Sequence, residues 1–242
     1  MPLAVKPKLL KLTALAAGLL CLLLRAILFA TGLDMKGLLV AGHWAGTCSW
    51  LLTAGIIGLI FFTLRTVSGP PAYSDAFPSS PIRAAGSLVA ACGFALSGVP
   101  AAGGPFASAE LVLRILAAAA LVAAAYCRFR GKKASVLLHS AVCLYLALRM
   151  VCLYQRWSAD PQLQHYVFYL GAHLALMLCS YQLAAFGADS GNHKSLWGWG
   201  LASIYLCLGA LPGSEDPFFL LCCAIWMFTG LSSLTPAANK GD

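Results

Sequence analysis

The sequence predicts an all-α, polytopic transmembrane helix bundle of about eight spans. Of the 242 residues, 60% are hydrophobic and only 10% are charged, whereas charged residues make up about a quarter of a soluble domain. The apolar residues gather in runs of about 20, the length that a helix needs to cross the hydrocarbon core of a bilayer. Composition and run length therefore indicate a multi-pass protein with one integral membrane domain, 1–242.

Turn residues and charges divide the apolar runs into eight expected spans. The third and seventh are the least secure, because the third is diluted by Gly and Ser and the seventh is short. We expect the first span to be retained and not cleaved as a signal peptide, because Arg25 interrupts its core and no small-x-small site follows. The spans are 9–32, 38–64, 83–100, 107–127, 134–154, 165–187, 195–211 and 217–235.

Basic residues are distributed unevenly between the loops. With eight spans, the side that holds both termini carries eleven Lys and Arg residues, and the other side carries only Lys36 and Arg156. The positive-inside rule then predicts an N-in, C-in topology in the cytoplasmic membrane. The net charge of +8 does not indicate nucleic acid binding, because the positive residues flank apolar runs and do not cover a soluble face.

Metal and cofactor binding are not expected. The ten cysteines lie in or beside apolar runs, as small hydrophobic residues do, and no Cys/His spacing typical of a zinc site occurs. Catalysis is not favoured either, because no span contains a nucleophile beside a base or a pair of carboxylates. A membrane-embedded acyl or phosphoryl transferase with His43 or His173 as its base is the least favoured alternative.

Several polar residues lie at a similar depth near the expected outer ends of their spans. Arg25, Arg114 and Arg149 are five to seven residues from those ends, roughly 8–10 Å below the outer boundary. His43 and His173 also lie toward the outer ends of their spans. A charge at this depth indicates either a long side chain that snorkels to the lipid phosphates or a buried functional group.

The direction in which helical side chains lean separates the three arginines. Arg114 leans outward and can pair with Glu110, one turn before it. Arg25 and Arg149 lean toward the bilayer centre and have no acidic partner left within the spans. Backbone carbonyls, the outer-loop residues Asp34 and Asp160, or a bound anion remain as partners, so we expect the loss of Arg25 or Arg149 to cost more than the loss of Arg114.

A short pattern recurs in the two halves of the chain. Arg25, Asp34 and His43 follow one another in the first half, and an Arg, an Asp and a His recur in that order in the second half. One interpretation is a 4+4 parallel internal repeat with halves 1–133 and 134–242. The two sets would then face each other across a pocket that opens outward. The members of the second set are Arg149, Asp160 and His173.

Aromatic residues complete the candidate ligand site. Tyr145 lies one turn from Arg149, and Tyr169 lies one turn from His173. An aromatic, net-positive pocket is typical of a site for an anionic amphiphile or a small anion, which the protein would bind or transport. The first alternative is an accessory or assembly subunit in a membrane complex, whose polar layer is structural. The candidate residues are Arg25, His43, Arg114, Tyr145, Arg149, Tyr169 and His173.

Small residues on the third span predict how it packs. Gly86, Ala90, Gly93 and Ser97 recur on one face, and such faces allow two membrane helices to approach closely. GHWAG at 42–46 has the G-x-x-x-G spacing in the second span. We expect both to be packing surfaces.

The distribution of basic residues makes the topology testable. In whole cells, a cysteine placed at Lys132 should be protected from a membrane-impermeant thiol reagent, and a cysteine placed at Glu215 should be labelled. Permeabilising the cells should expose the first site and leave the second unchanged. Labelling of both sites in intact cells would contradict the eight-span topology.

Overall fold

The computed structural model describes residues 7–34, 39–40, 42–66, 77, 79–98, 106–157, 166–232 and 234. Eight helices lie within these residues, and each overlaps one of the expected spans, so the all-α prediction and the number of helices are confirmed. The helices are α1 (Pro7–Thr31), α2 (Trp44–Thr66), α4 (Pro81–Leu96), α5 (Ala107–Phe129), α6 (Val136–Trp157), α7 (Val167–Gly187), α8 (His193–Ala210) and α9 (Pro217–Ser232).

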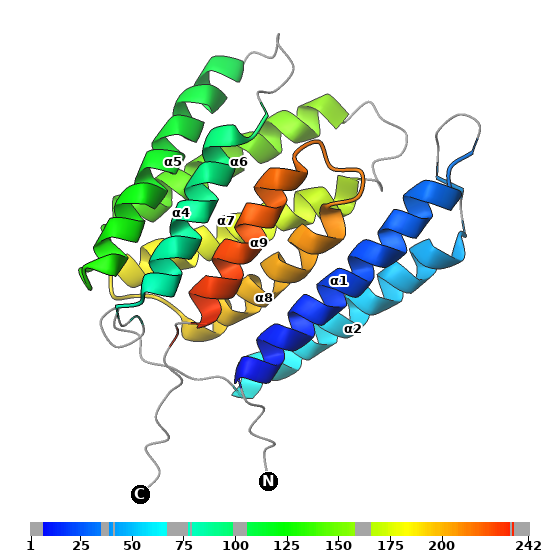
Figure 1. Cartoon of the computed structure of the whole chain (residues 1–242), viewed down its shortest axis with the longest axis horizontal. Coiled ribbons are helices and arrows are strands. Elements are labelled where there is room, and N and C mark those ends of the chain that lie inside the picture. Colours follow the sequence, from blue (N-terminus) through cyan, green and yellow to red (C-terminus); the bar gives the residue numbers. More distant parts are fainter. Residues whose placement is uncertain are drawn as a thin grey trace, which may run out of the picture.

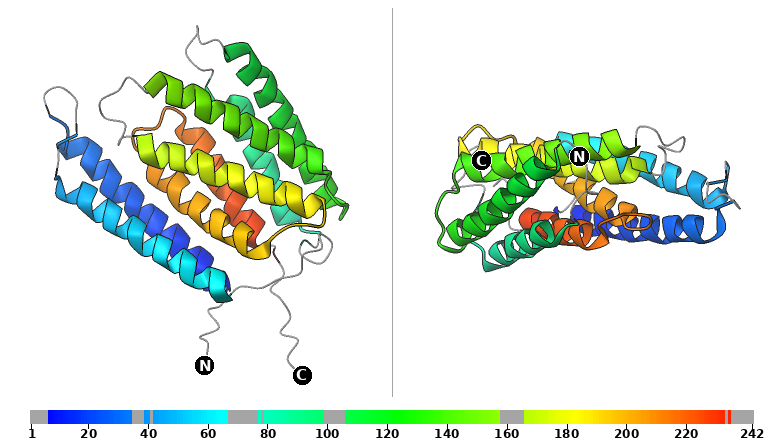
Figure 2. Two further views of the ribbon diagram at one scale, coloured as in Figure 1. Left: turned by 180° about the vertical axis from the view of Figure 1, so that it is seen from behind. Right: turned by 90° about the horizontal axis from the view of Figure 1, so that it is seen from above.

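Six of the helices form a closed ring. From α4 to α9, each helix packs against the next one in the chain, and α9 packs back against α4. The α1–α2 hairpin lies outside this ring and docks mainly on α8 (Figure 1). Figure 2 shows two layers, with α4, α9 and α1 in one and α6, α7 and α2 in the other. The most central helix is α8, which contacts α1, α2, α7 and α9.

The two ends of the bundle differ in what they hold. We call the end where α4 leads to α5, α6 to α7 and α8 to α9 the pocket end. The opposite end, which holds the start of α1 and the end of α9, is called the terminal end (Figure 1). Because α1 begins and α9 ends at the same end, the arrangement is compatible with an even number of crossings. Which end faces the cytoplasm stays a prediction.

Five helices are long and apolar enough to cross a bilayer, namely α1, α2, α5, α6 and α7. The chain is therefore a multi-pass membrane protein. Helices α4 and α9 have 16 residues each, which is about 24 Å against a hydrocarbon core of about 30 Å. Helix α8 carries two Trp, three Gly and two Ser residues among its 18, and neighbouring helices bury most of it. Helices α4, α8 and α9 are thus the three that do not meet the length and hydropathy of a full span. The two spans that were least secure in the sequence correspond to α4 and α8.

Large apolar side chains cover the outside of the bundle. On α2, which packs mainly against α1 and α8, the side chains of Leu51 and Phe61 are each 68% exposed. In water such surfaces would drive aggregation, whereas lipid tails solvate them as well as a protein interior does. The exposed surface thus fits contact with a lipid bilayer.

The small-residue face of α4 packs against α9, as expected. A Cβ atom at Gly86 would lie 1.9 Å from Thr229 Oγ1, and one at Gly93 would lie 2.6 Å from Cys222 Cβ. The expectation for 42–46 holds only in part. Gly46 lies opposite Leu28 of α1, but Gly42 precedes α2 with a positive φ of 81°. Gly42 therefore serves the turn into α2 and not the helix contact.

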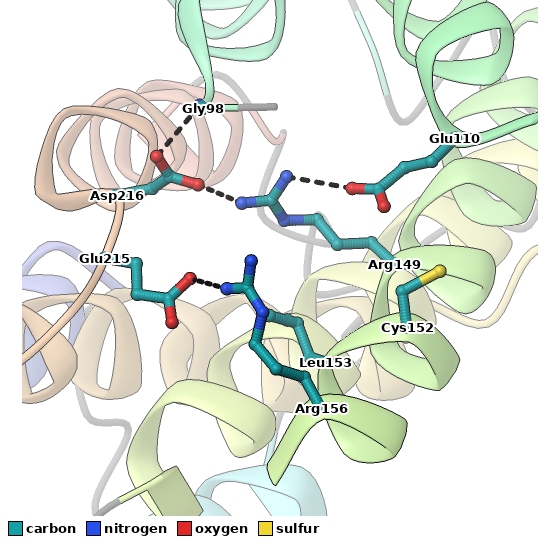
Figure 3. Close-up of a pocket in the computed structure, with 8 residues that line it drawn as sticks. All are labelled: Gly98, Glu110, Arg149, Cys152, Leu153, Arg156, Glu215 and Asp216. Atoms are coloured by element: carbon teal, nitrogen blue, oxygen red, sulfur yellow. Dashed lines mark hydrogen bonds and ion pairs between the residues drawn. The ribbon is translucent and has the colours of Figure 1, made fainter. Parts of the chain in front are cut away.

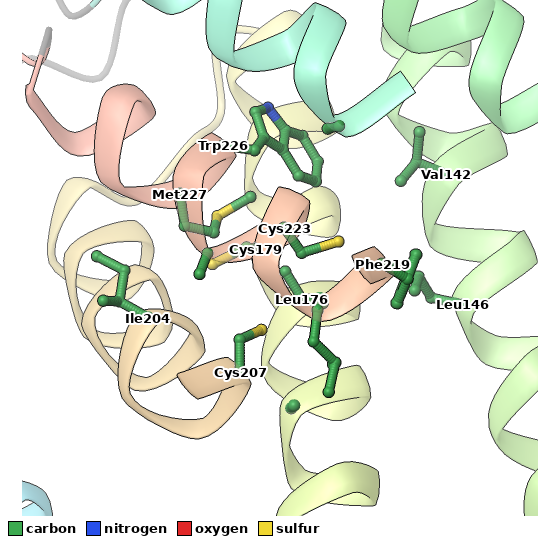
Figure 4. Close-up of a cluster of buried hydrophobic side chains, with 14 of the residues drawn as sticks. Val142, Leu146, Leu176, Cys179, Ile204, Cys207, Phe219, Cys223, Trp226 and Met227 are labelled. Carbon is green, nitrogen blue, oxygen red and sulfur yellow. The ribbon is translucent and has the colours of Figure 1, made fainter. Parts of the chain in front are cut away.

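The interior of the ring is filled with side chains. Cys179, Cys207 and Cys223 are fully buried among aliphatic and aromatic residues (Figure 4). Trp226 and Phe219 fill the space between α9 and its neighbours. The cysteines thus pack as small hydrophobic residues. Among the described residues, no group of three His, Cys, Asp or Glu side chains is placed to hold a metal ion.

The packing gives the two expected halves different surroundings. In the second half, α7 packs closely against α8, whereas the counterpart pair in the first half, α2 and α4, does not pack closely. The bundle divides by contact into a ring of six helices and a hairpin, not into two units of four. The internal repeat and its halves, 1–133 and 134–242, stay a prediction.

The α4–α9 contact gives a test of ring closure. Replacing Gly93 by Ala forces a methyl group against Cys222 Cβ, and overpacking of this kind costs about 1–3 kcal/mol. Thermal unfolding in detergent should show a lower midpoint for Gly93→Ala. Gly58→Ala on α2 is the matched control, because a Cβ there meets nothing within 4 Å. Equal midpoints for the two variants would contradict the close approach of α4 and α9.

Candidate functional site

Arg149 is the centre of a polar network at the pocket end of the ring. Its side chain comes from α6 and is 4% exposed. Nη1 donates to Glu110 Oε1 at 3.2 Å and to Tyr145 Oη at 3.0 Å. Nη2 donates to Tyr169 Oη at 3.3 Å and to Asp216 Oδ2. One guanidinium group thus joins α5, α6, α7 and the residue before α9.

Asp216 extends the network to α4. Its second oxygen, Oδ1, accepts a hydrogen bond of 2.9 Å from the backbone N–H of Gly98, just after α4 (Figure 3). The Arg149 guanidinium also lies 5.3 Å from the centre of the Phe219 ring on α9. Five of the six ring helices and the connection from α8 to α9 therefore meet around Arg149.

Local sequence places each member of the network. Tyr145 and Arg149 are four residues apart on α6, so they share one face. Glu110 lies in the first turn of α5, where the helix dipole favours a carboxylate. Asp216 directly precedes Pro217, the first residue of α9. Proline suits that position because the first helical N–H has no partner within the helix.

A pocket of about 180 Å³ lies beside the network. A second ion pair, Arg156–Glu215, forms its rim, where the two side chains are 33% and 45% exposed. Three carboxylates and two guanidinium groups line the pocket, so its lining carries one formal negative charge in excess. The lining residues are Gly98, Glu110, Arg149, Cys152, Leu153, Arg156, Glu215 and Asp216 (Figure 3).

The expected pairing of the arginines was wrong. Glu110 pairs with Arg149 and not with Arg114, whose Nη1 donates to the backbone oxygen of Ser97 at the end of α4. Arg149 consequently has two acidic partners, although none was expected for it within the spans. Its guanidinium group is held at the pocket end, beside the first turn of α5 and the start of α9. The outward lean of Arg114 agrees with its contact to Ser97.

Arg25 does not lie in the pocket with Arg149. Its guanidinium group lies 4.3 Å from the centre of the Phe168 ring and 5.4 Å from that of Phe29. Phe168 and Tyr169 are adjacent residues of α7, so the two arginines contact α7 through different side chains. Arg25 is buried where the hairpin docks on the ring, so the site shared by the two arginines stays a prediction that the pocket beside Arg149 does not support.

The two histidines lie in unlike surroundings. His173 is fully buried in α7, where Nδ1–H donates to the backbone oxygen of Tyr169 at 2.9 Å and the ring stacks on Phe219. His43 was expected within the second span but precedes α2. Its Nδ1 accepts the N–H of Ala45 at 3.3 Å, so it caps the start of that helix and is half-buried. Asp160, a member of the second Arg, Asp, His set, lies outside the described residues, so the meeting of the two sets stays a prediction.

Three members of the network were expected from the sequence, and other residues around the pocket were not. Arg149, Tyr145 and Tyr169 were expected as site residues and do meet. Asp216 and Glu215 were assigned to an outer loop, and Cys152 was treated as a small hydrophobic residue. Asp216 directly precedes a helix that starts on the expected outer side, and this position was the feature of the sequence that could have placed it near Arg149. A carboxylate there lies at the same end as Arg149.

The fold and the site define a multi-pass α-helical membrane protein with a buried ion-pair network and a polar pocket at one end of the bundle. Comparison with protein-family models, curated proteins and solved structures found no match.

The network predicts unequal costs for two arginines that line the same pocket. Arg149→Leu leaves buried carboxylates without their cation and should lower the free energy of unfolding by about 3–5 kcal/mol. Arg156→Leu removes an exposed pair and should cost no more than about 1 kcal/mol. Unfolding of both variants in detergent, followed by tryptophan fluorescence, measures the difference. Similar costs would contradict the central role of Arg149.

Proposed function

We propose that this protein is a membrane-embedded binding protein that takes a small polar ligand into the pocket beside Arg149. The observation that carries the proposal is the cavity of about 180 Å³ lined by five charged side chains. A purely structural ion-pair network would be stabilised by closing such a space and satisfying every buried polar atom. Here, one oxygen of the buried Glu110 carboxylate is left without a hydrogen-bond partner among the described residues.

The pocket changes the class of ligand that the sequence suggested. An anion bound at Arg149 would have to displace Glu110 or Asp216, which already neutralise that guanidinium group. Arg156 is the cation at the rim, and its exposed pair with Glu215 is easier to open. We therefore assign an anionic part of the ligand to the rim and not to the buried layer.

Binding is favoured over transport by what lies below the pocket. Phe219 and Trp226 fill the ring interior toward the terminal end (Figure 4). A permeation path would need a rearrangement of this packed interior, whereas binding at the pocket end needs none. Transport of an anion through the bundle, which the sequence also suggested, gains no support from this packing.

An accessory role in a membrane complex is the runner-up. Gly55 and Gly58 on α2 have nothing within 4 Å of an added Cβ, and α2 lies at the edge of the bundle. Such a face suits a partner helix and suits lipid equally well. A partner protein in the membrane therefore stays a prediction.

The proposal requires that the pocket admit small solutes from water. The thiol of Cys152 lines the pocket and is half-buried, whereas Cys179 is fully buried in the ring interior. Hydroxyethyl methanethiosulfonate, a neutral hydrophilic reagent, should modify Cys152 in the folded protein and leave Cys179 unmodified. Peptide mass spectrometry locates the modified residues. If Cys152 is as unreactive as Cys179, the pocket is closed and the proposed function is wrong.

A further inference from the structure

Glu110 holds the unsatisfied oxygen at the inner wall of the pocket. The residue is 2% exposed, and its Oε1 is occupied by Arg149 Nη1 at 3.2 Å. Its Oε2 is buried and has no hydrogen-bond partner among the described residues. Figure 3 shows this second oxygen turned from the Arg149 guanidinium group, on the side where the aliphatic part of Arg149 and Cys152 lie. A thiol is only a weak donor, so Cys152 does not replace a full hydrogen bond.

Each arginine around the pocket donates to a partner other than Glu110 Oε2. Arg149 directs both terminal nitrogens to Glu110 Oε1, two tyrosines and Asp216. Arg156 donates to Glu215, and Arg114 donates to the backbone oxygen of Ser97. A guest that reaches Glu110 Oε2 would thus break no bond of the network.

The chemistry of Glu110 defines the guest. A carboxylate oxygen accepts hydrogen bonds and cannot donate them, so the guest has to present an N–H or O–H group. The lining side chains carry one negative charge in excess, which favours a positively charged donor over a neutral one. Arg149 Nε, which also lacks a partner, can donate to an oxygen atom next to that group.

On this basis, which rests on the proposed binding function, we propose that the pocket binds the protonated primary amine of a small ligand, with Glu110 Oε2 as its acceptor. An oxygen close to the amine fits Arg149 Nε, and an anionic group further out fits Arg156 at the rim. A free amino alcohol and an aminoethyl phosphate lipid headgroup share this chemistry. The amine is the part that the buried wall recognises.

The reactivity of Cys152 measures the preference directly, with three reagents that differ only in the group they carry. Aminoethyl methanethiosulfonate has a positive charge and N–H donors, the trimethylammonioethyl reagent has the charge without donors, and the sulfonatoethyl reagent is an anion. Each rate at Cys152 is divided by the rate of the same reagent with free mercaptoethanol. The normalised rates should fall in that order, with the first about tenfold above the last, the size expected for one unpaired charge a few ångström away.

Glu110→Gln tests the residue itself. The change keeps the shape and removes the charge, so the advantage of the aminoethyl reagent over the sulfonatoethyl reagent should fall about tenfold. Asp189→Asn is the matched control, because Asp189 forms an exposed pair with Lys133 at the terminal end. It should retain the preference of the parent protein. Elution by size and the thermal midpoint show whether each variant is folded.

The outcomes separate the two proposals. A Cys152 thiol that none of the reagents modifies overturns the binding function and the amine with it. Equal normalised rates would show that the pocket admits solutes without preferring an amine, as a cavity that holds only water would. That result leaves the binding function standing and overturns the amine proposal. Equal rates for the aminoethyl and trimethylammonioethyl reagents also overturn it, because charge alone would then decide. With the expected order in hand, protection of Cys152 by ethanolamine supports a free ligand, and protection only by ethanolamine lipid in mixed micelles supports a headgroup.

Discussion

The closed ring of helices depends on one buried cation. Arg149 takes a carboxylate from the start of α5, a carboxylate from the connection before α9, and two phenolic oxygens from α6 and α7. Removing a guanidinium group from water is costly unless all its terminal N–H groups find acceptors. The helices that supply these acceptors are therefore held in one arrangement at the pocket end.

The opposite end of the ring uses cations in a different way. Arg83 from α4 lies over Phe77 at 3.7 Å from the ring centre, and Arg128 from α5 lies 2.9 Å from His139 Nε2 on α6. A guanidinium donor requires that nitrogen to be the acceptor, so His139 is neutral in this contact. Aromatic rings and imidazole are weaker partners than carboxylates. At the pocket end, in contrast, one buried guanidinium group meets two carboxylates.

The sequence predicts the helices well because their signal is local. Runs of apolar residues bounded by turns locate all eight helices, and the small face of α4 identifies a packing surface before any partner is known. The ion pairs are different. Glu110 lies four residues from Arg114 in the chain, yet it pairs with Arg149, 39 residues away. Local spacing indicated only the Glu110–Arg114 pair, and the packing of α6 against α5 brought Arg149 to Glu110 instead.

The site could be predicted only in part for the same reason. Tyr145 and Arg149 are neighbours on one helix, and their contact follows from helical periodicity. Asp216 is 67 residues from Arg149, and its approach depends on how α9 closes against α4. Arg25 and Arg149 look alike in the sequence, since each is a lone arginine in an apolar run. Only the docking of the hairpin on α8 gives them different neighbours.

The position of the α1–α2 hairpin outside the ring has a consequence for synthesis. The hairpin is made first, but its main docking partner, α8, begins at His193. Arg25 must therefore enter the membrane before Phe168, the ring it lies against, has been translated. A charged residue in an unassembled span has to be shielded by water, lipid phosphates or the insertion machinery until its partner is made. Because of the order of translation, the first two helices thus remain without their main docking partner until α8 has been synthesised.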